Sequence, residues 1–244
     1  MKLKTVRVRR NRPSTLSLAL ALMITMLCVY LGTLASLPKP AADTASAGTF
    51  ASGEVRMEGM NVIFECEGRY DTMMEAQVLS AYCAQSGGAG LVLKEDGQYA
   101  VVRDTAKNPG ENSIARSANG LTLQLRGAAD EIAAVSDAAA FLHAQANETG
   151  SLAESLEKGD TDEESIAALM SIYITRGRKI QTALNSIESK HEAVNLLRSA
   201  TKDALSRLKT AADDPDAGKL RLIHAAACAD WIDMLNELTE KGDA

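Results

Sequence analysis

The sequence predicts an α+β fold: an N-terminal transmembrane helix, a small four-stranded antiparallel sheet module with the order βαββ(α)β, and an all-α C-terminal region. Three observations support it. An uncharged apolar run covers residues 15–37, short segments alternate apolar and polar residues between positions 60 and 127, and apolar residues recur at three- and four-residue steps from position 128 onward. Alternation is typical of half-buried strands, and three- and four-residue recurrence is typical of amphipathic helices.

The N-terminus predicts membrane attachment. Residues 1–14 hold six Lys and Arg residues and no acidic one, and the run 15–37 is long enough for the ~20 apolar residues that cross a bilayer. The positive-inside rule keeps the basic tail in the cytoplasm and predicts that residues 38–244 lie outside the cell membrane. A cleaved signal peptide is the alternative, because Ala45-Ser46-Ala47 resembles a cleavage site.

The charge distribution narrows the partner classes. The whole chain has a net charge of −6, and setting aside the six basic residues of the tail leaves −12 for residues 38–244. Such an acidic region would be repelled by nucleic acid and by anionic lipids, so we expect no nucleic-acid partner. A neutral polymer or another protein is the easier partner.

A small module is predicted between residues 60 and 127, after a flexible linker at 38–59 that is rich in Ala, Ser, Thr and Gly. A first strand around Val62–Cys66 leads to a helix capped by Asp71 or Thr72 and ended by Gly87 and Gly88. Asp96-Gly97 predicts a hairpin between two further strands. A reduced helix at 110–119 and a fourth strand at 121–126 complete the module.

The helical region covers residues 128–244. We expect one helix over 128–147, a long helix from about residue 163 to 212, a break at Asp213-Asp214-Pro215, and a last helix that carries Trp231. Each has an apolar stripe that must be buried, so a helical hairpin or a three-helix bundle is predicted.

The module resembles the SPOR (sporulation-related repeat) domain over residues 60–127. Phe64–Tyr70 (FECEGRY) is similar to the family's first-strand motif, with Glu67 as an extra residue before Gly68. The further matching positions are Ala76 and Leu79 in the helix, the Gly87-Gly88 turn, Leu91–Leu93, and Gly97–Val102.

This resemblance implies a function and a site. SPOR domains bind peptidoglycan, favour glycan strands stripped of their peptides, and gather at division or sporulation septa. The chain would then be a membrane-anchored, non-enzymatic wall-binding protein. We expect the site on the sheet face that the helix leaves uncovered, where aromatic rings stack on sugars and polar groups bind hydroxyls. The candidates are Glu65, Arg69, Tyr70, Gln98 and Tyr99; Tyr70 and Tyr99 could instead belong to the core.

No pattern in the sequence predicts catalysis, a cofactor or a metal. His143, His191 and His224 are widely separated and lack a second ligand at metal-binding spacing. The chain has no Gly-x-Ser-x-Gly nucleophile elbow, and Gly87–Gly90 is not followed by the Gly-Lys-Ser/Thr of a phosphate-binding loop.

Two cysteines of the module could form a disulfide. Cys66 is expected on the inward face of its strand and Cys83 on the inward face of the helix, so the two could bridge in an oxidising exterior. Two buried free thiols are the alternative. Neither Cys28 nor Cys228 suggests a metal site.

A different class of function stays open. The chain could be a membrane-anchored scaffold whose acidic helical tail binds septal or sporulation proteins, while the SPOR-like module is purely structural. In a further alternative the tail forms a dimerising bundle and has no other partner.

Overall fold

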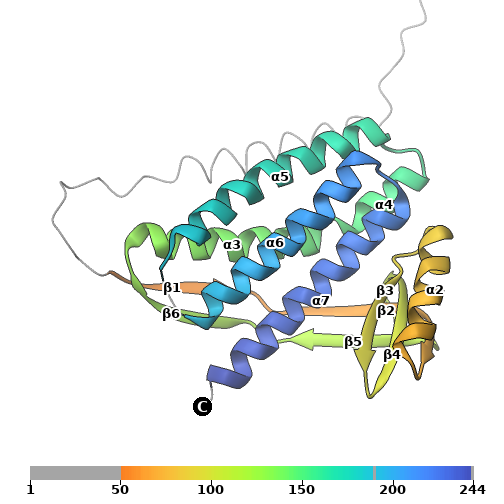
Figure 1. Cartoon of the computed structure of the whole chain (residues 1–244), viewed down its shortest axis with the longest axis horizontal. Helices are drawn as coiled ribbons and strands as arrows, with labels where there is room; N and C mark the ends of the chain where they lie inside the picture. The colour runs from red at the N-terminus through yellow and green to blue at the C-terminus, as the bar shows by residue number, and fades with distance from the viewer. Residues whose placement is uncertain (1–50, 189–190, 243–244) are drawn as a thin grey trace, which may run out of the picture. The chain divides into compact units, whose positions relative to one another are not determined.

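The strands form a two-stranded ribbon and a four-stranded antiparallel sheet in the computed structural model, which describes residues 51–188 and 191–242 (Figure 1). The ribbon pairs β1 (Ala51–Met57) with β6 (Leu121–Gly127). The strand order of the sheet is β3-β4-β2-β5. Its strands are β2 (Met60–Tyr70), β3 (Leu91–Glu95), β4 (Gln98–Ala106) and β5 (Ser113–Ala118).

Local sequence explains the central elements. In β2 the buried Phe64 and Cys66 alternate with exposed glutamates. The helix α2 (Met73–Gln85) begins where the Thr72 hydroxyl accepts a hydrogen bond from the Glu75 N–H at 3.3 Å. The β3–β4 hairpin turns at Asp96 (φ 49°) and Gly97 (φ 81°), and the two positive φ values match a type I′ turn.

The pairing of β2 with β4 contains two irregularities. The register shifts between Glu65 and Cys66 and again between Cys66 and Gly68, so Arg103 and Glu67 have no residue directly opposite. The Arg103 guanidinium donates a hydrogen bond to Glu67 Oε1 at 3.0 Å. These are β-bulges, which change the face toward which the following side chains point.

Helices cover both faces of the sheet. The consecutive residues Val101 and Val102 of β4 are both 0% exposed, although neighbouring residues of a strand point to opposite faces. Val101 packs in a small cluster with α2, whereas Val102 belongs to the main core. The last helix, α7 (Ala217–Gly242), contacts all four strands of the sheet and also contributes to that core.

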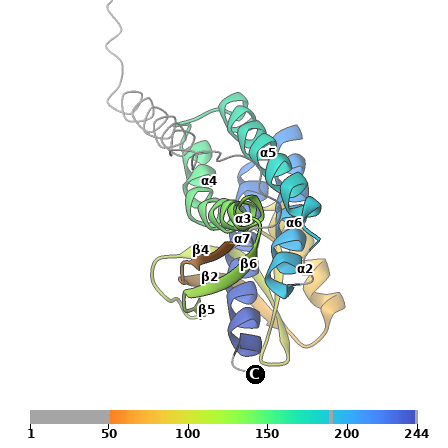
Figure 2. The ribbon, with the colours of Figure 1, turned by 90° about the vertical axis from the view of Figure 1, so that its left-hand side faces the viewer.

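One of the four remaining helices packs on the ribbon, and the others pack on helices. The four helices are α3 (Ala129–Glu148), α4 (Gly150–Glu157), α5 (Glu163–Ser186) and α6 (Glu192–Asp213). α3 contacts both strands of the ribbon, and α5 and α6 pack on α3 (Figures 1 and 2). Strands and helices share one hydrophobic core, and the Trp231 indole N–H of α7 donates a hydrogen bond to the Glu58 carbonyl at 2.9 Å.

The predicted architecture needs correction, although the α+β content and the four-stranded antiparallel sheet are confirmed. The fourth strand of the sheet is β5, in the segment predicted as a reduced helix. The predicted fourth strand exists as β6 but pairs with β1, which lies in the predicted linker. The long helix expected from 163 to 212 is two helices, α5 and α6. The C-terminal region has five helices among the described residues and packs on the sheet, so it is no separate hairpin or three-helix bundle.

The structure describes no transmembrane helix at the predicted position. Residues 15–37 lie outside the described residues. None of the helices between residues 51 and 242 that the structure describes is long and apolar enough to cross a membrane.

Candidate functional site

The predicted glycan-binding residues separate into two groups. Tyr70 and Tyr99 face each other across β2 and β4, half-buried, and pack against the small cluster under α2. Gln98 donates a hydrogen bond to Asp71 Oδ1 at 2.9 Å, just before α2 begins. The structure therefore brings these three residues together at one end of the sheet, where they support α2.

Glu65 and Arg69 also belong to β2 and are exposed, and Arg69 directly precedes Tyr70. Arg69 Nη2 donates to the Ser113 carbonyl of β5 at 3.4 Å, and Ser113 also pairs with Glu65 in the ladder. The sequence predicts all five candidates around the sheet face that the helix leaves uncovered. Because α7 packs on the face opposite α2, much of that face is covered.

Cys66 and Cys83 are free, buried thiols in the structure. Cys66 belongs to the main core, whereas Cys83 belongs to the cluster under α2. Burial is the main cause that raises the pKa of each thiol.

An open pocket of about 660 Å³, here called the β2 pocket, lies where β4 ends. β4 stops pairing with β2 at Ile63, so Met60–Val62 pair only with β5. The other edge of that short segment faces the pocket. The lining residues are Met60–Ile63, Thr105–Lys107, Ala115–Ser117, Ala146, Asn147, His224 and Cys228.

The lining combines apolar and hydrogen-bonding groups. Met60, Val62 and Ile63 supply apolar side chains, while Asn61 and Asn147 supply exposed amides. Arg116 also lines the pocket, but its guanidinium is paired with Asp233 at 2.6 Å and with Glu95 at 3.5 Å. Lys107 is exposed and has no ion pair within the described part of the chain.

A cysteine and a histidine lie side by side in the pocket wall. Cys228 Sγ is 3.9 Å from both ring nitrogens of His224, and it donates to the Ala146 carbonyl at 3.5 Å. Burial raises the pKa of Cys228 to about 12 and lowers the pKa of His224. Near neutral pH the thiol keeps its proton and the imidazole is uncharged, so the pair lacks the thiolate that a cysteine nucleophile needs.

Metal binding finds no support in the described residues. Among positions 51–188 and 191–242, no three His, Cys, Asp or Glu side chains are grouped so that they could hold an ion.

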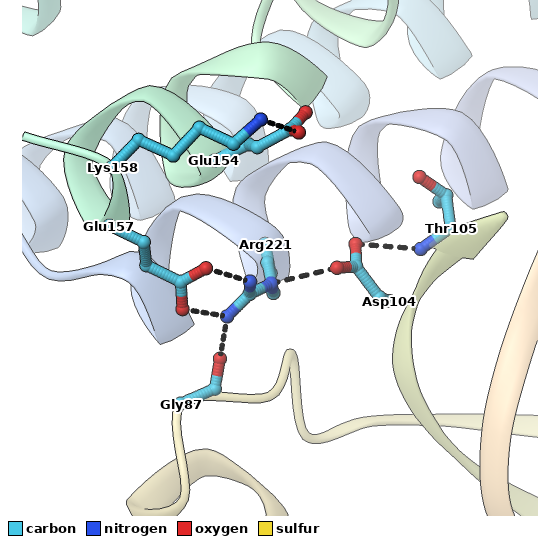
Figure 3. Close-up of polar contacts among 7 residues, drawn as sticks. All are labelled: Gly87, Asp104, Thr105, Glu154, Glu157, Lys158 and Arg221. Carbon is cyan, nitrogen blue, oxygen red and sulfur yellow. Dashed lines mark hydrogen bonds and ion pairs between the residues drawn. The ribbon is translucent and has the colours of Figure 1, made fainter. Parts of the chain in front are cut away.

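Arg221 of α7 forms a polar network with β4, α4 and the turn after α2 (Figure 3). Its guanidinium donates to Asp104 Oδ2 at 2.8 Å, to both carboxylate oxygens of Glu157 at 2.8 and 2.6 Å, and to the Gly87 carbonyl at 2.5 Å. Asp104 in turn accepts the N–H of Thr105, a pocket residue, at 2.8 Å. One side chain thus joins α7 to α4, to β4 and to the turn after α2.

Sequence reasoning missed the residues of the β2 pocket. No local pattern connects Asn61 of β2, Lys107 just after β4 and Asn147 of α3, and Asn147 stood out only as part of a glycosylation sequon. The available signal was the end of the β4 pattern near residue 106, which leaves the start of β2 without a neighbour on one side.

No family model, no curated protein and no solved structure matches this chain. The SPOR resemblance therefore stays a prediction from the sequence.

Proposed function

We propose that this chain is a non-enzymatic binding protein, held at the cell membrane through residues 15–37, whose extracytoplasmic part takes up peptidoglycan glycan strands in the β2 pocket. The SPOR resemblance over residues 60–127 supplies the ligand class. The observation that carries the proposal is the β2 pocket itself. It offers space for a ligand, whereas α7 packs on the sheet face where the site was predicted.

The size and lining of the pocket suit a short stretch of sugar chain. A volume of about 660 Å³ falls within the roughly 300–1,000 Å³ of small-molecule sites. Sugar rings present apolar faces and hydroxyl edges, and the pocket offers apolar side chains beside the amides of Asn61 and Asn147 and the hydroxyl of Ser117. Affinity for one such shallow site would be modest, and several anchored copies would reinforce it.

Charge contributes little to this binding. With −12 on residues 38–244, the region has no general attraction for an anionic polymer. Binding that rests on hydrogen bonds and apolar contacts should change little with moderate salt, whereas electrostatic adhesion would weaken as screening increases.

The proposal is tested by sedimenting purified sacculi with the full chain in detergent, with and without amidase pretreatment of the sacculi. We expect greater binding after pretreatment and no release of soluble sugar. The variant Asn61→Ala/Ser117→Ala/Asn147→Ala should lose binding, since all three side chains are exposed in the pocket.

A second triple variant locates the site. Glu65→Ala/Arg69→Ala/Gln98→Ala changes three exposed residues outside the pocket and should bind like the unchanged chain. Loss of binding in this variant alone would return the site to the predicted end of the sheet. Equal binding by both variants and the unchanged chain would refute a specific glycan site in either place.

The scaffold alternative has less support from the helical region. Among the described residues of α3–α7, Ile172 is the one large apolar side chain that is exposed. Docking of septal or sporulation proteins on these helices would therefore have to rest on polar contacts.

A further inference from the structure

The outer face of α2 is apolar and exposed. Met73 is 43% exposed, Met74 76%, Val78 54% and Tyr82 65%, and these are four of the five large apolar side chains exposed within the described ranges. Together they present on the order of 400 Å², which is the size of the largest patch on a typical monomer and is often functional.

The patch exists because α2 is apolar on two sides. Its inner side packs Ala76, Leu79 and Cys83 against the sheet. On the outer side Met74, Val78 and Tyr82 follow each other at four-residue steps and form one stripe along the helix. Figure 1 shows α2 at the outer side of the sheet, away from α3, α5 and α6.

We propose that this stripe docks on the same stripe of a second copy, with the two α2 helices antiparallel about a twofold axis at Val78. This inference goes beyond glycan binding and does not rest on it. A twofold axis pairs each residue with its counterpart in an isologous interface. Val78 then lies beside Val78 of the second copy, and Met74 lies beside Tyr82, which brings thioether sulfur to an aromatic ring, a favourable contact.

The charge distribution makes this stripe the surface where a second copy is least repelled. Two regions of −12 repel each other, so copies can approach best where the surface is nearly neutral. Glu75 is the one charged residue among the thirteen of α2. The stripe thus offers no charges that would select an oppositely charged partner.

The buried area predicts a weak dimer. Two such patches bury on the order of 800 Å² in total, below the roughly 1,200 Å² of stable interfaces. We therefore expect reversible pairing that becomes substantial when copies are concentrated in one membrane.

Cysteine crosslinking of the full chain in membranes tests the geometry, with Cys28→Ser in every variant. Cys66, Cys83 and Cys228 are buried and should not compete. Val78→Cys should give a disulfide-linked dimer on mild oxidation. Gln77→Cys is the matched control, because Gln77 is also exposed but points about a quarter turn away from the stripe.

Mixed samples test the orientation. Copies with Met74→Cys and copies with Tyr82→Cys should crosslink to each other more than either does to itself. Val78→Glu should abolish self-association in sedimentation while leaving the far-UV spectrum and sacculus binding unchanged, since Val78 lies outside the β2 pocket.

Three results would overturn the inference. These are equal crosslinking by Val78→Cys and Gln77→Cys, preferential self-crosslinking of Met74→Cys, or crosslinking of Val78→Cys only to a different protein. None of them affects the glycan proposal, because sacculus binding is measured separately with variants of the β2 pocket.

Discussion

Replacing Arg221 by Met should destabilise the protein more than its position near the surface suggests. Methionine keeps most of the aliphatic stem but removes four hydrogen bonds, which reach Asp104, Glu157 and the Gly87 carbonyl. The Arg221 side chain is 17% exposed, whereas both carboxylates are more accessible to water. Hydrogen bonds to charged groups contribute roughly 1.5–3 kcal/mol, and water can replace part of what is lost here. We expect a loss of about 2 kcal/mol in the free energy of unfolding.

The measurement is thermal unfolding of the full chain at pH 7 followed by circular dichroism. For a chain of this size, 2 kcal/mol corresponds to a decrease of about 4–8 °C in Tm. Lys158→Met is the matched control in Figure 3, because the exposed Lys158–Glu154 pair lies at the same end of α4 as Glu157. Exposed ion pairs contribute little to the free energy of unfolding, so this control should have the same Tm as the unchanged chain. A Tm of Arg221→Met equal to that of the control would refute the reasoning.

The pH dependence provides a second check on the same contact. The hydrogen bond from Arg221 is the main cause that lowers the pKa of Glu157 in the folded state. A carboxylate with a lowered pKa stabilises the fold above its unfolded pKa of about 4.3 and loses that contribution as the pH falls through the folded value. The stability difference between the unchanged chain and Arg221→Met should therefore shrink below about pH 4.

Further predictions concern the pocket wall and the N-terminus. Gly150→Ala should cost about 1–3 kcal/mol, because its Cβ would lie 2.8 Å from the His224 ring, whereas Gly110→Ala meets open space and should be neutral in the same unfolding assay. Burial lowers the pKa of His224, so an NMR titration of the ring should give a pKa below the ordinary 6.5. The stability of the fold should decrease as the pH drops below 6.5, because the unfolded chain takes up the proton first. Cys228, with a pKa of about 12, should resist maleimide at pH 8 until the protein is denatured. The full chain should remain in membranes after an alkaline carbonate wash; a soluble form that begins near residue 48 would indicate a cleaved signal peptide.

Strong local patterns predicted much of the fold. The alternation around Phe64, the cap at Thr72, the Asp96-Gly97 turn and the helical period of α3 all correspond to observed elements. In each case the residues that determine the element lie within a few positions of one another. Local sequence is sufficient there because the same few residues set both the conformation and the buried face.

Strands that depend on distant partners were missed. β1 contains Ala51, Ser52 and Gly53, which is typical of a linker, but it pairs with β6 some seventy positions later. Gly53 is needed there, since a Cβ would lie 2.8 Å from the Ile132 side chain of α3. β5 buries only Ile114 and Ala118, and pairing with β2 makes it a strand. Such tertiary context overrides propensity.

The helix break between α5 and α6 was also missed. α5 ends at Ser186, with Ile187 extended at ψ 120°, and α6 starts after His191. Neither glycine nor proline marks this position, and the apolar spacing runs on from one helix into the next. The helix breaks here because α6 folds back on α5, which buries the apolar stripes of both helices in one core.

One unpaired residue of β2 explains why the candidate site could not be located from the strand pattern. Strict alternation would place Phe64, Cys66 and Tyr70 on one face of β2. Glu67 has no residue opposite it in β4 and forms a bulge. Beyond it Tyr70 pairs with Tyr99 on the face covered by α2, whereas Phe64 and Cys66 lie in the core with α7. A shift of one residue moves every later side chain to the other face. Tyr70 and Tyr99, the aromatic pair predicted to stack on sugars, therefore pack in the cluster under α2. The pocket large enough for a ligand lies at the opposite end of β2, beyond the end of β4.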